Sequence, residues 1–72
     1  MKIFFKEDLY NLEGIKSSIS VFESEKLAKF EVIKKDNGFE VKIKEIEDEI
    51  KDILKDEFSN YALAESRKKA RE

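Results

Sequence analysis

The chain has 72 residues, of which 44% are charged and 40% hydrophobic, and its formal net charge is −2. It contains no cysteine and no histidine, which excludes disulfides, thiol catalysis, histidine bases and zinc fingers. The length allows one small α+β domain over residues 1–72, and the balanced charge favours neither nucleic acid nor an anionic membrane as the default partner.

The hydrophobic residues occur in short runs. The longest wholly apolar run is Ile3 to Phe5, far below the roughly 20 residues that span a bilayer. The amino terminus also lacks the apolar core of about 7 to 15 residues that a signal peptide carries. We therefore expect a cytoplasmic protein without membrane contact. Because no disulfide cross-links the small core, contact with a protein partner or formation of a homodimer would bury additional apolar surface and so add stability.

The first predicted element is a short strand over residues 2–6. Ile3 and Phe5 would share one face of the sheet, and Phe4 would lie on the other. Ile33, an apolar residue on the outer side of a later strand, is the expected neighbour of Phe4 across the sheet. These two side chains are either scattered surface apolar residues, which are normal, or a small patch on the open face that a partner binds.

A helix is predicted next, over residues 12–22, with Asn11 as its N-cap and Asp8 as the alternative. Its apolar residues follow the three- and four-residue spacing of a helical stripe: Leu12, Ile15, Ile19 and Phe22. Gly14 and the nearby serines weaken the intrinsic helix propensity. Packing on the sheet must therefore hold this helix, and its small residues would allow a close approach to the sheet.

Residues 28–46 predict a β-hairpin. The apolar side chains alternate onto one face: Ala28, Phe30, Val32, Phe39, Val41 and Ile43. The segment 36–38 carries the turn signal, because Asn37 and Gly38 adopt the positive φ of a tight turn at low cost. A loop of residues 37–38 would pair Val32 with Ile43, and a loop of residues 35–38 would pair Val32 with Val41. Both registers keep the apolar residues on one face.

After the hairpin, the acidic residues 47–49 suit the positive end of a helix dipole, and Asp48 is the expected N-cap. A helical stripe follows: Ile50, Ile53, Leu54, Phe58, Tyr61 and Ala62. Ser59 and Asn60 interrupt it, so one long bent helix and two helices both remain open. The predicted order is β-α-β-β-α, with a further α if this segment divides. The three-stranded sheet has order 1-3-2, a right-handed crossover and helices packed on one face.

The sequence offers little for catalysis. Carboxylate pairs such as Asp52 and Asp56 lie among lysines, which is typical of a solvated helix surface. The serines at 17–20 have no histidine to activate them, and no glycine loop cradles a phosphate. We predict a protein that is not an enzyme, with no catalytic residues, cofactor or metal site, although a carboxylate-only metal site is chemically open.

Two sets of residues are candidates for binding. The first set, for a protein or peptide partner, comprises Phe4, Ile33 and Leu63. The second, for nucleic acid, is the basic cluster Arg67, Lys68, Lys69 and Arg71. Glu65 and Glu72 dilute this cluster, and no aromatic platform accompanies it. An extended peptide is expected to add a strand at the sheet edge formed by residues 27–34.

Two segments resemble a known family. The run Leu9-Tyr10-Asn11-Leu12-Glu13-Gly14-Ile15, continuing to Phe22, resembles the tyrosine, helix, isoleucine, phenylalanine opening of small HxsD-like proteins. The run Phe58-Ser59-Asn60-Tyr61-Ala62-Leu63, followed by Arg67, is similar to their Phe-x-Asn-x-x-Leu segment before an arginine-bearing helix. The chain departs from the family by ending soon after Arg67, where more helix is expected.

HxsD-like proteins accompany radical-SAM enzymes in peptide-modification systems of the His-Xaa-Ser type. The resemblance therefore implies an accessory role beside a maturase or its precursor peptide, and it transfers no catalytic residues. Our leading hypothesis is a non-catalytic binding module for a precursor peptide or a partner maturase in the biosynthesis of a ribosomally made, modified peptide (RiPP). The alternatives are a small nucleic-acid-associated regulator that uses the basic C-terminal helix and a self-associating structural domain.

Overall fold

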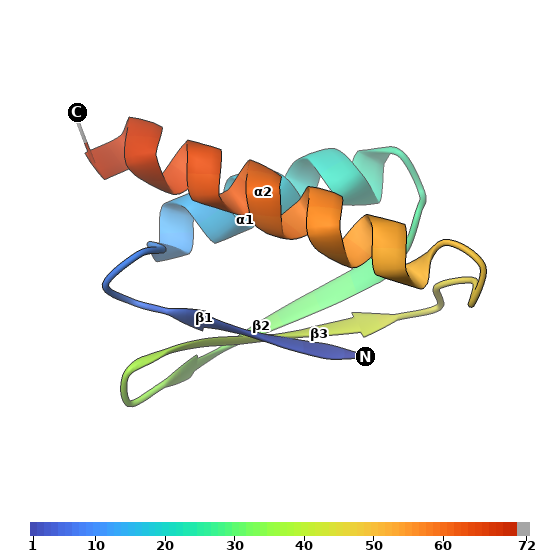
Figure 1. The fold of residues 1–72 in the computed structure, drawn as a ribbon, viewed down its shortest axis with the longest axis horizontal. Coiled ribbons are helices and arrows are strands. Elements are labelled where there is room, and N and C mark those ends of the chain that lie inside the picture. Colours follow the sequence, from blue (N-terminus) through green and yellow to red (C-terminus); the bar gives the residue numbers. More distant parts are fainter. Residues whose placement is uncertain (71–72) are drawn as a thin grey trace.

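The computed structural model describes the backbone of residues 1–70 and the side chains of residues 1–68. Its elements are β1 (Lys2–Lys6), α1 (Leu12–Ser24), β2 (Lys29–Lys35), β3 (Gly38–Lys44) and α2 (Lys51–Ala70). The sheet has the order β1-β3-β2, and β3 is antiparallel to both neighbours. Both helices cover one face of the sheet and leave the other open (Figure 1). The predicted α+β architecture, sheet order and one-sided helical layer are confirmed.

The hairpin has the second of the two expected registers. Val32 lies opposite Val41, and pairing continues to Lys35 opposite Gly38, so that residues 36–37 form the turn. Neither Asn37 nor Gly38 has a positive φ, so that prediction is wrong. Gly38 is required for a different reason: a Cβ there would overlap the carbonyl oxygen of Phe5 and lie 2.7 Å from Cζ of Phe4.

The core lies between the sheet and the helices. It consists of Ile3, Phe5, Ile15, Phe22, Ala28, Phe39, Val41, Ile43, Leu54, Phe58 and Ala62. Phe58, fully buried, lies at its centre: its ring stacks on Phe30 with centroids 4.7 Å apart and contacts Phe22 at 5.5 Å. The predicted apolar stripe of α2 is wrong at Ile53, which is 60% exposed.

The start of α1 is fixed to α2. Asn11 is the N-cap, as predicted, because its Oδ1 accepts a hydrogen bond from the Gly14 N–H at 2.7 Å. The Asn11 main-chain N–H donates to Ser66 Oγ at 3.1 Å, and its Nδ2 donates to the Ser66 carbonyl at 3.0 Å. A Cβ on Gly14 would lie 2.6 Å from the Ser66 nitrogen. The small residues of α1 therefore approach α2 and not the sheet, contrary to expectation.

Further along the same contact, the buried Ser18 hydroxyl donates to the carbonyl of Phe58 at 3.2 Å. This bond joins the two helices near the centre of the core.

The end of α1 is a Schellman motif. The Lys26 N–H donates to the Glu23 carbonyl at 2.9 Å, and the Leu27 N–H donates to the Phe22 carbonyl at 3.4 Å. Lys26 has φ 58°, which places a lysine at the position where glycine is usually found.

The second helix begins later than expected and is continuous. Its first intrahelical bond runs from the Leu54 N–H to the Ile50 carbonyl at 2.8 Å, so Asp48 is not the N-cap. Asp48 lies in the preceding turn, with Oδ1 3.6 Å from Lys51 Nζ. The helix passes through Ser59 and Asn60 without a break, because Phe58 and Ala62 on either side are fully buried.

Candidate binding surface

The open face of the sheet carries the first two predicted partner-binding residues. Phe4 of β1 lies opposite Glu40 of β3, and Ile33 of β2 lies opposite Glu40 from the other side. The three side chains form one row, so Phe4 and Ile33 are separated by two strand spacings, about 10 Å. They are therefore not direct neighbours, and the sequence prediction needs that correction.

Phe4 has a structural role as well as an exposed surface. Its ring leans over Gly38, where the nearest ring atoms lie 2.7 and 3.0 Å from the place of a Cβ. The side chain nevertheless remains 46% exposed, whereas Ile33 is half-buried. One side of the Phe4 ring thus covers Gly38, and the rest of the ring is exposed to solvent.

The same face is strongly basic. The register places on it six lysines and two glutamates: Lys2, Lys6, Lys29, Lys35, Lys42 and Lys44, with Glu31 and Glu40. These side chains carry a formal charge of +4, whereas the whole chain carries −2. The positive charge is therefore concentrated on the side opposite to the helices.

Ion pairs within the molecule use only part of this charge. Lys44 pairs with Glu31 at 3.3 Å, and Lys29 pairs with Glu45 at 3.3 Å. Within residues 1–68, the other lysines of the face form no ion pair; these are Lys2, Lys6, Lys35 and Lys42. Lys2 lies directly opposite Lys42, an arrangement of like charges that is unfavourable across a sheet.

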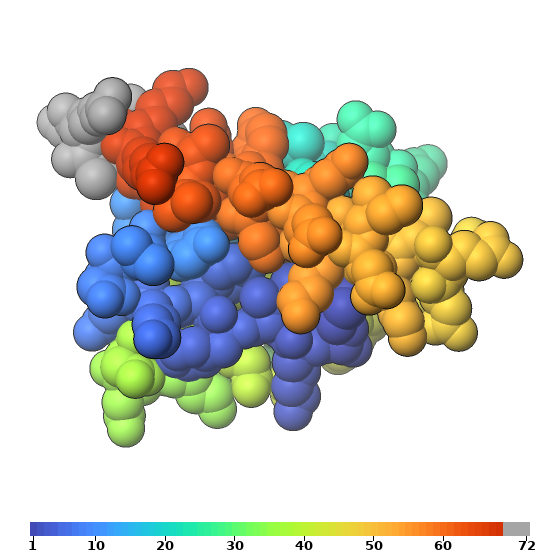
Figure 2. Space-filling view, viewed as in Figure 1, coloured from blue at the N-terminus to red at the C-terminus, as the bar shows by residue number. Residues whose placement is uncertain are grey.

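The two edges of the sheet differ. On β1, Met1 and Ile43 exchange main-chain hydrogen bonds at 2.8 and 3.2 Å. The alternation of an antiparallel ladder therefore directs the main-chain groups of Lys2 and Phe4 outward. Figure 2 shows β1, in dark blue, uncovered beneath α2 along the near side of the molecule.

On β2, the edge at which we expected a peptide to bind, Glu23 occupies the outward N–H of Phe30 at 3.1 Å. By the same alternation, Val32 and Lys34 also direct main-chain groups outward from β2, so this edge is obstructed at Phe30 alone, whereas the described residues make no such contact at Lys2 and Phe4 of β1.

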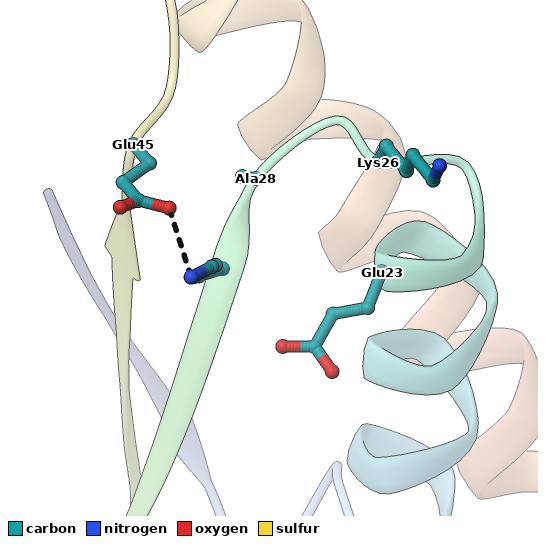
Figure 3. A pocket seen from close by; sticks show the side chains of 5 residues that line it. Glu23, Lys26, Ala28 and Glu45 are labelled. Atoms are coloured by element: carbon teal, nitrogen blue, oxygen red, sulfur yellow. Dashed lines mark ion pairs between the residues drawn. The ribbon is translucent and has the colours of Figure 1, made fainter.

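A shallow depression lies at one end of the molecule, between the end of α1, the start of β2 and the segment after β3 (Figure 3). In Figure 3, Glu45 faces Lys29 across the dashed ion pair, Glu23 points toward β2 and Lys26 points away. The two lysines and two glutamates balance one another. This depression therefore offers no net charge to attract a charged ligand.

A second hollow brings together the two segments that carry the family resemblance. Tyr10 and Asn11 face Leu63, Ser66 and Arg67 across it. The hydrogen bonds between Asn11 and Ser66 account for this contact as helix packing. Leu63, predicted for partner binding, is half-buried here.

The predicted nucleic-acid cluster is only partly described. Arg67 and Lys68 are exposed on the last turns of α2. The side chain of Lys69 and the whole of Arg71 lie outside the described residues.

Within the described residues, no three acidic side chains gather closely enough to hold a metal ion. The buried polar side-chain atoms of the described residues all have hydrogen-bond partners. No helix in this part of the chain is long and apolar enough to cross a membrane.

Sequence reasoning missed the contact between Gly14 and Ser66. The sequence did contain a signal for this contact: Gly14 and Ser18 are four residues apart, as are Ala62 and Ser66. That spacing puts two small residues on one face of each helix.

Comparison with protein-family models, curated proteins and solved structures found no match to this chain.

Proposed function

We propose that the protein is a non-catalytic binding module of the cytoplasm that presents β1 and the open sheet face to a peptide or protein partner. The partner is a precursor peptide or a maturase enzyme of a radical-SAM peptide-modification system. The observation that carries this proposal is the exposed ring of Phe4, which lies beside an uncovered strand edge on a face free of helices. An aromatic anchor next to an open edge is the combination that strand-adding recognition uses.

The proposal is tested by binding measurements between the purified chain and the precursor peptide or maturase encoded beside its gene. We expect Phe4→Ser to weaken binding about tenfold or more, since buried aromatic anchors dominate such interfaces. Ile53→Ser is the matched control, because Ile53 is 60% exposed on the helical side. It should bind like the unmodified chain.

Thermal unfolding followed by circular dichroism establishes first that both variants are folded. The absence of binding to any neighbouring peptide or maturase at micromolar concentration, with Phe4 intact, would overturn the proposal. Equal weakening by the two substitutions would overturn the assignment of the binding face.

A further inference from the structure

The main-chain groups and side chains of β1 together define what an added strand would look like. Outward-directed N–H and C=O groups are available at Lys2 and Phe4, and no hydrogen bond in the described part of the chain fills them. At Lys6 the carbonyl already accepts from the N–H groups of Leu9 and Tyr10, at 3.2 and 2.9 Å. The edge therefore ends at Lys6, and an added segment would pair over about five residues.

The side chains of β1 on the open face alternate Lys2, Phe4, Lys6. In a neighbouring strand, the side chains directly opposite would lie about 5 Å away, where opposite charges attract and like charges repel. Lys2 already faces Lys42 on its other side, and neither has an ion pair. A carboxylate arriving beside Lys2 would relieve this repulsion.

We propose that β1 binds an extended acidic peptide in which two acidic residues flank an apolar residue at alternate positions, so that the carboxylates meet Lys2 and Lys6 and the apolar side chain packs on Phe4. This inference rests on the proposed function and specifies the chemistry of its partner. The intervening peptide residues would face the helical side of the sheet, next to Ile3 and Phe5.

Two other binding partners, single-stranded nucleic acid and a second copy of the chain, fit β1 and the open sheet face less well. Single-stranded nucleic acid needs aromatic rings for stacking, whereas the row across the open face contains one ring, Phe4, with Glu40 directly beside it. A second copy that paired β1 with β1 in antiparallel fashion around Phe4 would place Lys2 against Lys6, which repel. The charge pattern therefore favours an acidic peptide.

The test uses three synthetic peptides of equal length, titrated into the isotopically labelled chain and followed by amide chemical shifts. Their central sequences are glutamate-threonine-leucine-threonine-glutamate, the same with lysine in place of both glutamates, and the same with serine in place of leucine. We expect the acidic apolar peptide to bind at least about tenfold more tightly than the lysine peptide, with the largest shifts at Lys2 to Lys6.

A charge exchange provides the decisive control. The double variant Lys2→Glu with Lys6→Glu should prefer the lysine peptide, whereas Lys51→Glu with Lys55→Glu on α2 should keep the original preference. Binding without charge preference, or shifts centred on another surface, would overturn the inference.

A tighter, steeply salt-dependent interaction with a single-stranded oligonucleotide at β1 would also overturn the inference, in favour of nucleic acid. If the encoded precursor peptide or maturase binds at Phe4 while no acidic peptide does, this inference fails and the proposed function stands.

Discussion

Gly14→Ala should destabilise the protein, although helix propensity alone predicts the opposite. Exchanging glycine for alanine inside a helix normally gains up to about 1 kcal/mol. Here the new Cβ would lie 2.6 Å from the nitrogen and 2.7 Å from the Cα of Ser66. These are backbone atoms of α2, so no side-chain rotation relieves the overlap.

The magnitude follows from the distance that the helices must separate. Restoring ordinary contact, at 3.4 Å, moves α1 and α2 apart by nearly 1 Å. That movement stretches the two hydrogen bonds between Asn11 and Ser66, now 3.1 and 3.0 Å long, beyond useful length. Overpacking costs about 1 to 3 kcal/mol and each lost bond about 1 kcal/mol. After the gain in propensity, we expect a net loss of about 2 to 4 kcal/mol.

Urea unfolding followed by circular dichroism at the helix band measures this loss. A change of this size lowers the melting temperature of a domain of this length by roughly 10 to 30 °C. Ser20→Ala, at an exposed position of the same helix, is the control and should be neutral or slightly stabilising. A Gly14→Ala variant at least as stable as the unmodified chain would refute the close helix contact.

Three further substitutions test other parts of the fold. Phe58→Ala removes the central ring and should cost about 3 to 5 kcal/mol, enough to leave much of the chain unfolded at 25 °C; a cooperative transition near the original midpoint would contradict the core assignment. Lys26→Gly removes the steric cost of a side chain at φ 58° and should stabilise the protein by about 0.5 to 1 kcal/mol in chemical denaturation. Lys26→Ala keeps a Cβ and should not stabilise it. Equal effects of the two substitutions would argue against the Schellman motif. Gly38→Ala should destabilise by about 1 to 3 kcal/mol, since its Cβ would meet the Phe5 carbonyl. The control Asn37→Ala, at an exposed position, should change the stability by no more than about 0.5 kcal/mol. A larger loss of stability from Asn37→Ala than from Gly38→Ala would show that the turn, and not the contact with β1, requires the glycine.

The sheet could be predicted from the sequence because alternation is local. Phe30, Val32, Val41 and Ile43 alternate with charged residues, and this pattern sets the buried face before any tertiary contact is known. The turn was misjudged at Asn37 and Gly38, because the need for glycine comes from β1, a strand more than 30 residues away in the chain.

The helices were predicted less well, because their termini depend on partners in space. Asp48 has the chemistry of an N-cap, yet the helix begins at Lys51. The pair Ser59 and Asn60 weakens a helix locally, but burial of Phe58 overrides that weakness.

The candidate surface was visible in part. Phe4 and Ile33 could be assigned to the open face from strand alternation. The predicted strand order already places a residue of β3 between them, and the register identifies that residue as Glu40. The difference between the two sheet edges depends on one side chain of α1, Glu23, whose position the pattern of the strands does not encode.

The carboxylate of Glu23 also affects how many added strands one molecule can bind. A sheet with two open sides can be extended at both, so that identical molecules would add end to end into a growing ribbon. Because Glu23 accepts a hydrogen bond from the Phe30 N–H, a strand that paired with β2 along its whole length would have to displace this carboxylate. Under the proposed addition of a strand at β1, this competition favours one added strand per molecule and complexes with a single copy of each component.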